Sequence, residues 1–299
     1  MLALLDTHVF FSSSTLTAAT VRCHATDSAS GAEEQSTAHS IAFVRRGMFL
    51  KHAGRESVVA DANQVLFFDP EVPYRVSHPL CCGDECATLT LPRDVLLTIL
   101  TEAEPHTYER RGPLFSTLAA PCPADAYLDS LRLLRPNTHA RAADLSFEEP
   151  ALRLAARAVQ ASRGTPPAST VRHSPRTVRA HRDAVATAQT LLAARLAETL
   201  TLAELARSVY TTTFHLCRIF RRYAGTSLHA YRLQLRLRAA LDRLADGAAD
   251  LTDLALQLGF VDHSHFTNAF RRAFGLTPSA FRRTASVRSV REMSKSLQV

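Results

Sequence analysis

Residues 251–283 read LTDLALQLGFVDHSHFTNAFRRAFGLTPSAFRR, and the chain carries a similar stretch 50 residues earlier. The later copy has HFTNAFRRAFGLTPSAFR at residues 265–282, where the earlier copy has HLCRIFRRYAGTSLHAYR at residues 215–232. In both copies apolar residues recur every three to four positions, which predicts amphipathic helices. The chain therefore builds one helical unit twice.

The two copies keep some positions and change others. The kept pairs are Phe220 and Phe270, Gly225 and Gly275, and Arg232 and Arg282. The changed pairs on the predicted outer face are Cys217 and Thr267, and Arg218 and Asn268. A short helix, a turn and a basic second helix form the helix-turn-helix arrangement, whose second helix lies in the major groove of DNA. A kept scaffold with a changed outer face predicts two different contacts with DNA.

The rest of the C-terminal region also has helical periodicity. Thr201 and Glu204 form a capping box that begins a short helix, and Thr277 followed by Pro278 begins a last one. The other predicted helices span residues 181–196, 213–223, 228–245, 251–258 and 263–274. The helix at 228–245 is about 27 Å long, so it can hold the two second helices about one DNA turn apart.

Charge is distributed unevenly along the chain. Residues 1–169 contain 15 Lys and Arg against 19 Asp and Glu, a net charge of −4. Residues 170–299 contain 20 against 9, a net charge of +11. The basic excess coincides with the repeated unit and favours a polyanion as its partner. On charge alone, a merely solvated basic surface is the alternative.

The N-terminal half has a different pattern. Between residues 20 and 90, short apolar runs such as SIAFVRRGMFLKH alternate with turn residues, which predicts an antiparallel sandwich or small barrel. Residues 93–161 then change to helical periodicity, with three predicted helices. We expect four parts in all: a β-rich domain with a helical part at 1–161, a linker at 162–176, a basic helical domain that binds DNA at 177–287 and a disordered tail at 288–299.

The C-terminal region resembles the DNA-binding domain of AraC/XylS-type transcriptional regulators. LALQLGFVDHSHFTNAFRRAFGLTPSAFR follows the second motif of that family, and LAELARSVYTTTFHLCRIFRRYAGTSLHAYR follows the first, with Tyr210 where glycine is usual. The N-terminal half, with its turn-rich FFDPEVPYRVSH segment, resembles the cupin-like sensing domain of many such regulators.

This resemblance implies a multidomain α+β fold. A cupin-like β-barrel with a helical dimerisation segment would be followed by an all-α domain with two helix-turn-helix motifs joined by a long helix. It also implies a homodimer on double-stranded promoter or operator DNA that regulates transcription, most often as an activator in contact with RNA polymerase.

Ten outward residues of the two second helices are the candidate DNA contacts. They are Thr213, Phe214, Cys217, Arg218, Arg221, His263, Ser264, Thr267, Asn268 and Arg271. Arg218, where the resemblance also places a base-reading residue, can bond guanine O6 and N7; Asn268 suits adenine and Phe214 a thymine methyl group. Arg221 and Arg271 suit phosphate, which adds affinity without sequence preference. For each residue, exposure without DNA contact is the alternative.

The segment HPLCCGDECATL, residues 78–89, holds a candidate sensor. Its members are His78, Cys81, Cys82 and Cys86. Clustered thiolates bind soft metal ions or act as redox switches, although this spacing fits no standard zinc pattern and incidental cysteines are the alternative. His39 and His52 form no close His-x-His pair with other histidines, so we expect no catalytic cupin metal centre.

An apolar or sugar-sized effector inside the barrel is a further interpretation. It would lie near Phe43, Phe67, Phe68 and Tyr74, which equally suit a simple core.

We expect a regulator that is not an enzyme and needs no cofactor. Two other classes stay open: a cupin-type metalloenzyme fused to a DNA-binding module, and an architectural protein that binds DNA without sequence preference. Six scattered cysteines do not suggest a secreted disulfide scaffold. No apolar run reaches the ~20 residues of a membrane helix, so we expect a cytoplasmic protein without a membrane partner.

Overall fold

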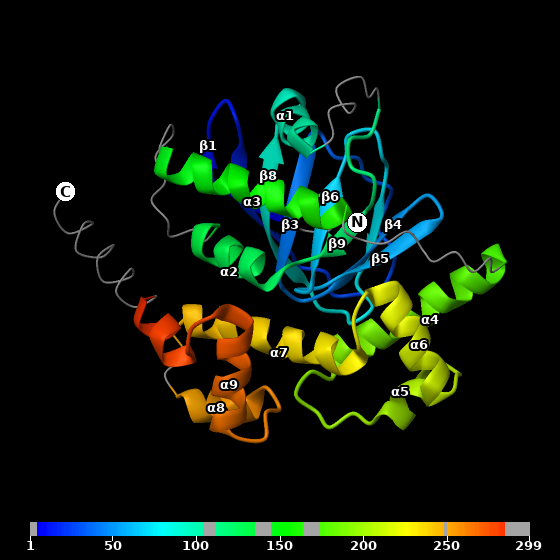
Figure 1. Cartoon of the computed structure of the whole chain (residues 1–299). Helices are drawn as coiled ribbons and strands as arrows, with labels where there is room; N and C mark the ends of the chain where they lie inside the picture. Colours follow the sequence, from blue (N-terminus) through cyan, green and yellow to red (C-terminus); the bar gives the residue numbers. More distant parts are fainter. Residues whose placement is uncertain (1–4, 104–111, 135–144, 164–173, 248–249, 285–299) are drawn as a thin grey trace.

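The computed structural model describes residues 5–103, 112–134, 145–163, 174–247 and 250–284 (Figure 1). All named strands except the short β9 (Ala119–Pro121) precede the first helix, so the fold combines an N-terminal antiparallel sheet structure with a C-terminal set of helices. None of the described helices has the length and apolarity needed to cross a membrane.

A six-stranded antiparallel sheet forms the centre of the N-terminal half. Its strands are β1 (Leu5–Ser12), β2 (Thr17–Cys23), β3 (His39–Arg46), β6 (Gln64–Phe68), β8 (Asp84–Leu91) and β9 (Ala119–Pro121), in the order β1-β2-β8-β3-β6-β9. Side chains alternate between the two faces of a strand. Ile41 and Phe43 therefore enter the main core, whereas Ala42 and Val44 pack toward a second sheet.

The second sheet has three strands, and it changes one expectation. It consists of β5 (Glu56–Ala60), β4 (Phe49–Ala53) and β7 (Arg75–Ser77), in the order β5-β4-β7. The apolar run at 40–52 is split at Gly47, whose φ of 73° reverses the chain, so β3 and β4 enter different sheets. Within the described residues strand pairing does not close these sheets into a barrel. The two sheets agree with the sandwich that the strand pattern left open and not with the barrel that the resemblance implied, and the cupin-like assignment stays a prediction.

Three helices cover the face of the six-stranded sheet that points away from the second sheet (Figure 1). They are α1 (Arg93–Ala103), α2 (Ala124–Leu133) and α3 (Leu145–Arg163), which together occupy the region 93–161 where three helices were predicted. Helix α3 buries Phe147, Leu154 and Val159 in the main core. The apolar face of this predicted dimerisation segment thus packs on the protein's own sheet, and the homodimer stays a prediction.

The C-terminal helices match the predicted periodicity, except that the first begins six residues before its predicted start at 181, where Ser174 caps it and Pro175 opens its first turn. They are α4 (Pro175–Ala194), α5 (Leu202–Ser208), α6 (Thr213–Ala224), α7 (Leu228–Ala245), α8 (Leu251–Gln257) and α9 (His263–Phe274). The capping box of Thr201 and Glu204 is confirmed at the start of α5. Figure 1 shows the pairs α5/α6 and α8/α9 at opposite ends of α7.

The apolar cores do not follow the predicted domain boundary. The first helix pair packs with α4 around Leu216, Ile219 and Phe220. The second pair shares one continuous core with the N-terminal sheet, to which Leu241 and Phe270 belong. Most of the predicted linker and the whole predicted tail lie outside the described residues, so these boundaries stay predictions.

Candidate nucleic-acid interface and sensing region

The two helix pairs turn in the same way although their turns differ in sequence. Tyr210 takes a left-handed backbone conformation with a φ of 52°, and Gly259 does so in the second turn with a φ of 77°. In both turns this residue and the next donate backbone hydrogen bonds to carbonyls of the preceding helix. A Cβ on Gly259 would lie 2.5 Å from the Ala197 oxygen, so glycine is required there. The side chain of Tyr210 projects into solvent, so the first pair keeps the same turn without glycine.

The second helices, α6 and α9, begin and end alike. Thr212 and Asp262 cap their first turns by accepting backbone hydrogen bonds, and Gly225 and Gly275 end them in left-handed conformations. Neither helix contains Asp or Glu, and each carries two arginines in its last turn. The repeat therefore produces two similar helices with basic outer surfaces.

Most of the candidate DNA contacts are exposed. The exposed ones are Thr213, Phe214, Cys217, Arg218, Arg221, Ser264, Asn268 and Arg271. His263 and Thr267 are half-buried, with the His263 Nε2 atom 3.5 Å from the Thr267 hydroxyl. Arg218 Nη2 lies 3.1 Å from His215 Nδ1 at the surface, so a base edge can compete for this guanidinium. The outer faces are thus available to a partner.

Apolar side chains also project into solvent near the start of both second helices. Tyr210 is 99% exposed, Phe214 79% and Val261 80%. Phe214 was among the predicted DNA contacts, whereas Tyr210 and Val261 were not, although a large apolar side chain inside a predicted turn was a signal for both. Apolar side chains in this position suit contact with thymine methyl groups in a major groove.

Helix α7 is held against the N-terminal half by a buried polar network that begins at the β5–β6 turn. Tyr231 donates its hydroxyl hydrogen to Asp61, and Asn63 donates to the Tyr231 carbonyl oxygen at 2.9 Å. Gln189 of α4 donates to the Tyr231 hydroxyl oxygen at 3.0 Å. Buried polar groups are costly unless they are hydrogen-bonded, so these contacts fix α7 on the turn.

Arg238 provides the middle of this network. Its side chain is 2% exposed and donates to the carbonyl oxygens of Ala62 and Cys122. The guanidinium also lies 5.0 Å from the centre of the Tyr127 ring. One arginine of α7 thus binds the β5–β6 turn and the segment that precedes α2.

Asp242 and two arginines at the end of β3 complete the network. Arg45 Nη2 lies 2.7 Å from Asp242 Oδ1, and Arg46 Nε lies 2.5 Å from Asp242 Oδ2. The Arg45 and Asp242 side chains are both 5% exposed, whereas Arg46 is half in solvent. The network missed by sequence analysis therefore runs along most of α7, between residues far apart in the chain.

The network has a pH dependence centred on Asp61. Burial raises the pKa of Asp61 from 3.8 to about 6, although hydrogen bonds from Tyr231 and Asn63 and the charge of Arg238 oppose the rise. In the folded protein the Asp61 carboxyl group therefore keeps its proton up to about pH 6, whereas in the unfolded chain it loses the proton from about pH 4. We expect Asp61 to lower the free energy of unfolding by about 3 kcal/mol as pH rises through that window.

This expectation can be measured by urea unfolding of the wild type and Asp61→Asn at several pH values, followed by circular dichroism. The stability of Asp61→Asn relative to wild type should rise with pH between about 4 and 6. A difference that stays constant over this range would contradict the assignment.

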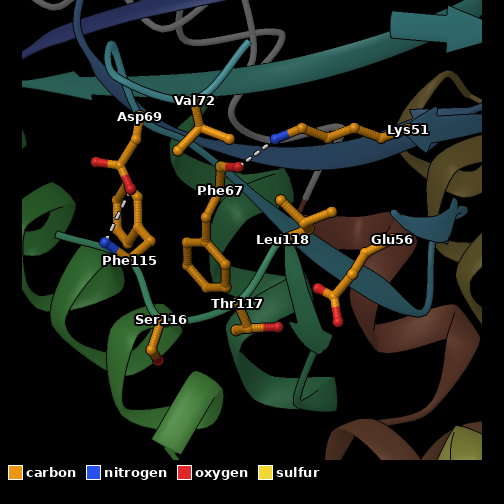
Figure 2. A pocket seen from close by; sticks show the side chains of 9 residues that line it. All are labelled: Lys51, Glu56, Phe67, Asp69, Val72, Phe115, Ser116, Thr117 and Leu118. Carbon is orange, nitrogen blue, oxygen red and sulfur yellow. Dashed lines mark hydrogen bonds between the residues drawn. The ribbon is translucent and has the colours of Figure 1, made fainter. Parts of the chain in front are cut away.

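A small pocket opens between the two sheets beside Lys51 (Figure 2). Its volume is about 90 Å³, below the roughly 300 Å³ at which pockets for small-molecule ligands begin. Lys51 is buried, donates to the Phe67 carbonyl oxygen and lies 3.6 Å from the centre of the Phe68 ring. Burial lowers the pKa of its ammonium group to about 7, against the opposing charge of Asp69.

The predicted aromatic effector site is distributed around this pocket. Phe67 lines it, Phe68 and Tyr74 surround the Lys51 ammonium, and Phe43 is fully buried in the core.

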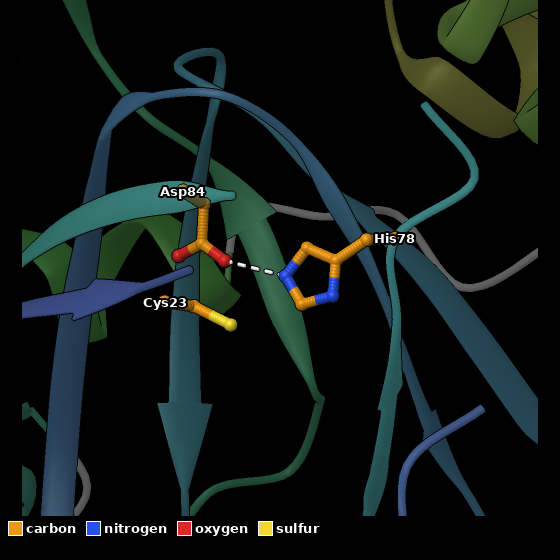
Figure 3. A group of neighbouring side chains, drawn as sticks. All are labelled: Cys23, His78 and Asp84. Atoms are coloured by element: carbon orange, nitrogen blue, oxygen red, sulfur yellow. Dashed lines mark hydrogen bonds and ion pairs between the residues drawn. The ribbon is translucent and has the colours of Figure 1, made fainter. Parts of the chain in front are cut away.

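The residues of the predicted sensor are not all together. Cys81 and Cys82 are exposed. Cys86 is buried, burial raises its pKa, and its thiol lies 3.4 Å from an oxygen of Asp84. In the described part of the chain, His78 instead forms a group with Cys23 and Asp84, two residues that sequence analysis missed (Figure 3). Cys23 and Asp84 come together because β2 pairs with β8 and places these two residues opposite each other.

Comparison with known proteins agrees with the geometry of the C-terminal part. The family model described as a helix-turn-helix domain matches residues 205–284. The HTH-type transcriptional regulator ArgR of Pseudomonas aeruginosa is 35% identical over 88 residues, which are 29% of this chain and 27% of ArgR. GlxA of Rhizobium meliloti is 39% identical over 80 residues, 26% of this chain and 24% of GlxA. The chain spans about a quarter of the length of these curated relatives.

Solved structures of regulators are also similar to this chain. A transcriptional regulator with an AraC-type DNA-binding domain from Chromobacterium violaceum is 29% identical, with a TM-score of 0.33, over 35% of this chain and 93% of its own. ToxT from Vibrio cholerae is 11% identical, with a TM-score of 0.38, over 90% of this chain and 97% of its own.

Residues 205–284 thus form a helix-turn-helix domain, the class of module by which transcription regulators bind DNA. The domain is of the AraC/XylS type, and the resemblance predicted from the sequence of this region is confirmed.

Proposed function

We propose that this protein is a sequence-specific DNA-binding transcription regulator in which α5/α6 and α8/α9 are two helix-turn-helix motifs. The observation that carries the proposal is that two similar second helices, neither of which contains Asp or Glu, lie at the two ends of α7. Helix α7 has 18 residues and spans about 27 Å. One turn of DNA is about 34 Å long, so α6 and α9 would enter successive major grooves on one face of the duplex.

The N-terminal half acts in this proposal as a cupin-like sensing and dimerisation domain without a catalytic role. The buried network along α7 supports it, because a signal that moved the β5–β6 turn would reach the helix between the two motifs. A small ligand, a metal ion or a redox change is the signal, and RNA polymerase is the partner at the promoter. The regulator acts as a homodimer and as an activator of transcription.

Selection of bound sequences from a random DNA pool tests the proposal. The full chain is used at physiological salt, because the second helix pair shares its core with the N-terminal half. We expect a motif of two short blocks about one helical turn apart. Salt-sensitive binding without a motif would favour an architectural DNA binder, and turnover that depends on a bound metal ion would favour the metalloenzyme fused to a DNA-binding module.

Substitution of Arg218 tests base reading directly. Arg218→Ala is expected to cost about 1–3 kcal/mol of binding free energy on the selected sequence and to relax the preference at one base pair. Arg271→Ala is the matched control, because the loss of a phosphate contact weakens binding on all sequences alike and reduces the salt dependence. Titration of both variants on selected and random DNA measures this, and an equal loss on both DNAs for Arg218→Ala contradicts base reading.

A further inference from the structure

Three potential metal ligands meet at one end of the two sheets, far in sequence from the helix pairs. Cys23 ends β2, Asp84 begins β8, and the two residues are paired opposite each other. His78 follows directly after β7 of the second sheet. The Cys23 sulfur, an imidazole nitrogen of His78 and a carboxylate oxygen of Asp84 all lie within 4.8 Å of one another. Figure 3 shows the Cys23 sulfur directed toward the His78–Asp84 pair.

The group is buried and its backbone is tightly fixed. Cys23 is 7% exposed and His78 5%, and the Asp84 side chain is 8% exposed. A Cβ on Gly83 would lie 1.8 Å from the Cys23 carbonyl oxygen, so only glycine lets the two strands approach here. Cys23 and Asp84 are therefore held together by the paired strands β2 and β8, and His78 by its place directly after β7.

A second group of similar composition shows what distinguishes this one. His39, Asp69 and Glu71 also lie together, but Asp69 accepts hydrogen bonds from the backbone N–H groups of Leu114 and Phe115 as well as from His39. That carboxylate fastens a loop to the sheet. Asp84 contacts His78 at 2.7 Å and the Cys86 thiol at 3.4 Å, and the Cys23 sulfur, a third potential metal ligand, lies within 4.8 Å of its carboxylate.

We propose that Cys23, His78 and Asp84 bind one zinc ion, with water in the fourth position. Sulfur, imidazole nitrogen and carboxylate oxygen are the ligands of tetrahedral zinc, and three protein ligands leave one position open. Calcium and magnesium take oxygen ligands alone and do not fit this set. The Cys23 thiol releases its proton to solvent when the metal binds. The ion would join β2 and β8 of the large sheet to the segment after β7, and so link the two sheets.

Metal titration of the chelator-treated full chain tests this site, and the test does not depend on DNA binding. Cobalt(II) is added first as a spectroscopic probe, and zinc then displaces it. We expect one equivalent of cobalt with a thiolate-to-cobalt absorption band that zinc removes. Zinc at 100 times its dissociation constant should raise Tm by roughly 5 °C. Absence of binding at micromolar metal would overturn the proposal.

Variants assign the ligands. Cys23→Ser should abolish the thiolate band. Cys23→Ser and His78→Gln should each weaken zinc binding at least about 100-fold, because losing a ligand costs more than changing a residue that only surrounds a ligand. The matched controls are Cys82→Ser and His24→Gln, which remove an exposed thiol and an exposed imidazole near the group and should leave band and affinity unchanged.

Loss of the band in Cys82→Ser with retention in Cys23→Ser would overturn the assignment. If Cys23→Ser does not fold without metal, Asp84→Asn takes its place. A loss of zinc affinity of at least tenfold supports the site, and an unchanged affinity overturns it.

Discussion

Replacement of Arg238 by methionine is expected to lower the free energy of unfolding by about 3–5 kcal/mol. The guanidinium is 2% exposed and donates to the carbonyl oxygens of Ala62 and Cys122, so its loss leaves both acceptors buried without this donor. Methionine fills much of the same volume, which limits any contribution from a cavity. Urea unfolding measures the change, and circular dichroism follows it because the chain contains no tryptophan.

Arg243→Met is the control for this experiment. Arg243 lies on the same helix but is exposed, and its contact is with Gln257 at the surface. Substitutions at such positions usually change stability by less than about 0.5 kcal/mol. Equal losses in the two variants would show that Arg238 adds no more than any arginine on α7.

Replacement of Asp242 by alanine is expected to cost a similar amount, about 3–5 kcal/mol, for a different reason. Arg45 is as buried as Asp242, so removal of the carboxylate leaves a guanidinium charge in the interior without its anionic partner. Asp246→Asn is the surface control: Asp246 pairs with the exposed Arg46, and the expected cost is about 0–1 kcal/mol.

A double-mutant cycle separates the lost ion pair from other effects of the Asp242 change. The double variant Arg45→Met with Asp242→Ala should be clearly more stable than the sum of the two single changes predicts, because no unpaired buried charge is then left. Additive losses in urea unfolding would mean that Arg45 is solvated or paired elsewhere when Asp242 is absent.

The C-terminal helices could be predicted because local rules decide them. The capping box at Thr201, the glycines that end α6 and α9, and the apolar spacing within each helix are all short-range signals. The left-handed turn at Tyr210 shows the limit of such rules, since the hydrogen bonds of the helix pair hold the turn without glycine.

The N-terminal half and the contacts between the halves could not be predicted in the same way. Whether strands close into a barrel depends on pairings between distant residues, as at Gly47, where one apparent run divides between two sheets. The sensor prediction relied on cysteines that are close in sequence, whereas strand register brings Cys23 to Asp84 from 61 positions away. Nothing local to Asp61 indicates its partner Tyr231, which follows 170 residues later.

The buried network gives α7 two roles at once. This helix is the spacer between the two helix pairs, and it is also the surface on which the ends of the N-terminal strands rest. In the proposed function, the separation and tilt of α6 and α9 would then be set by residues such as Asp61 and Arg45 that never touch DNA. Variation at those positions would change which distances between half-sites the regulator accepts, while the bases it prefers in each half-site stay the same.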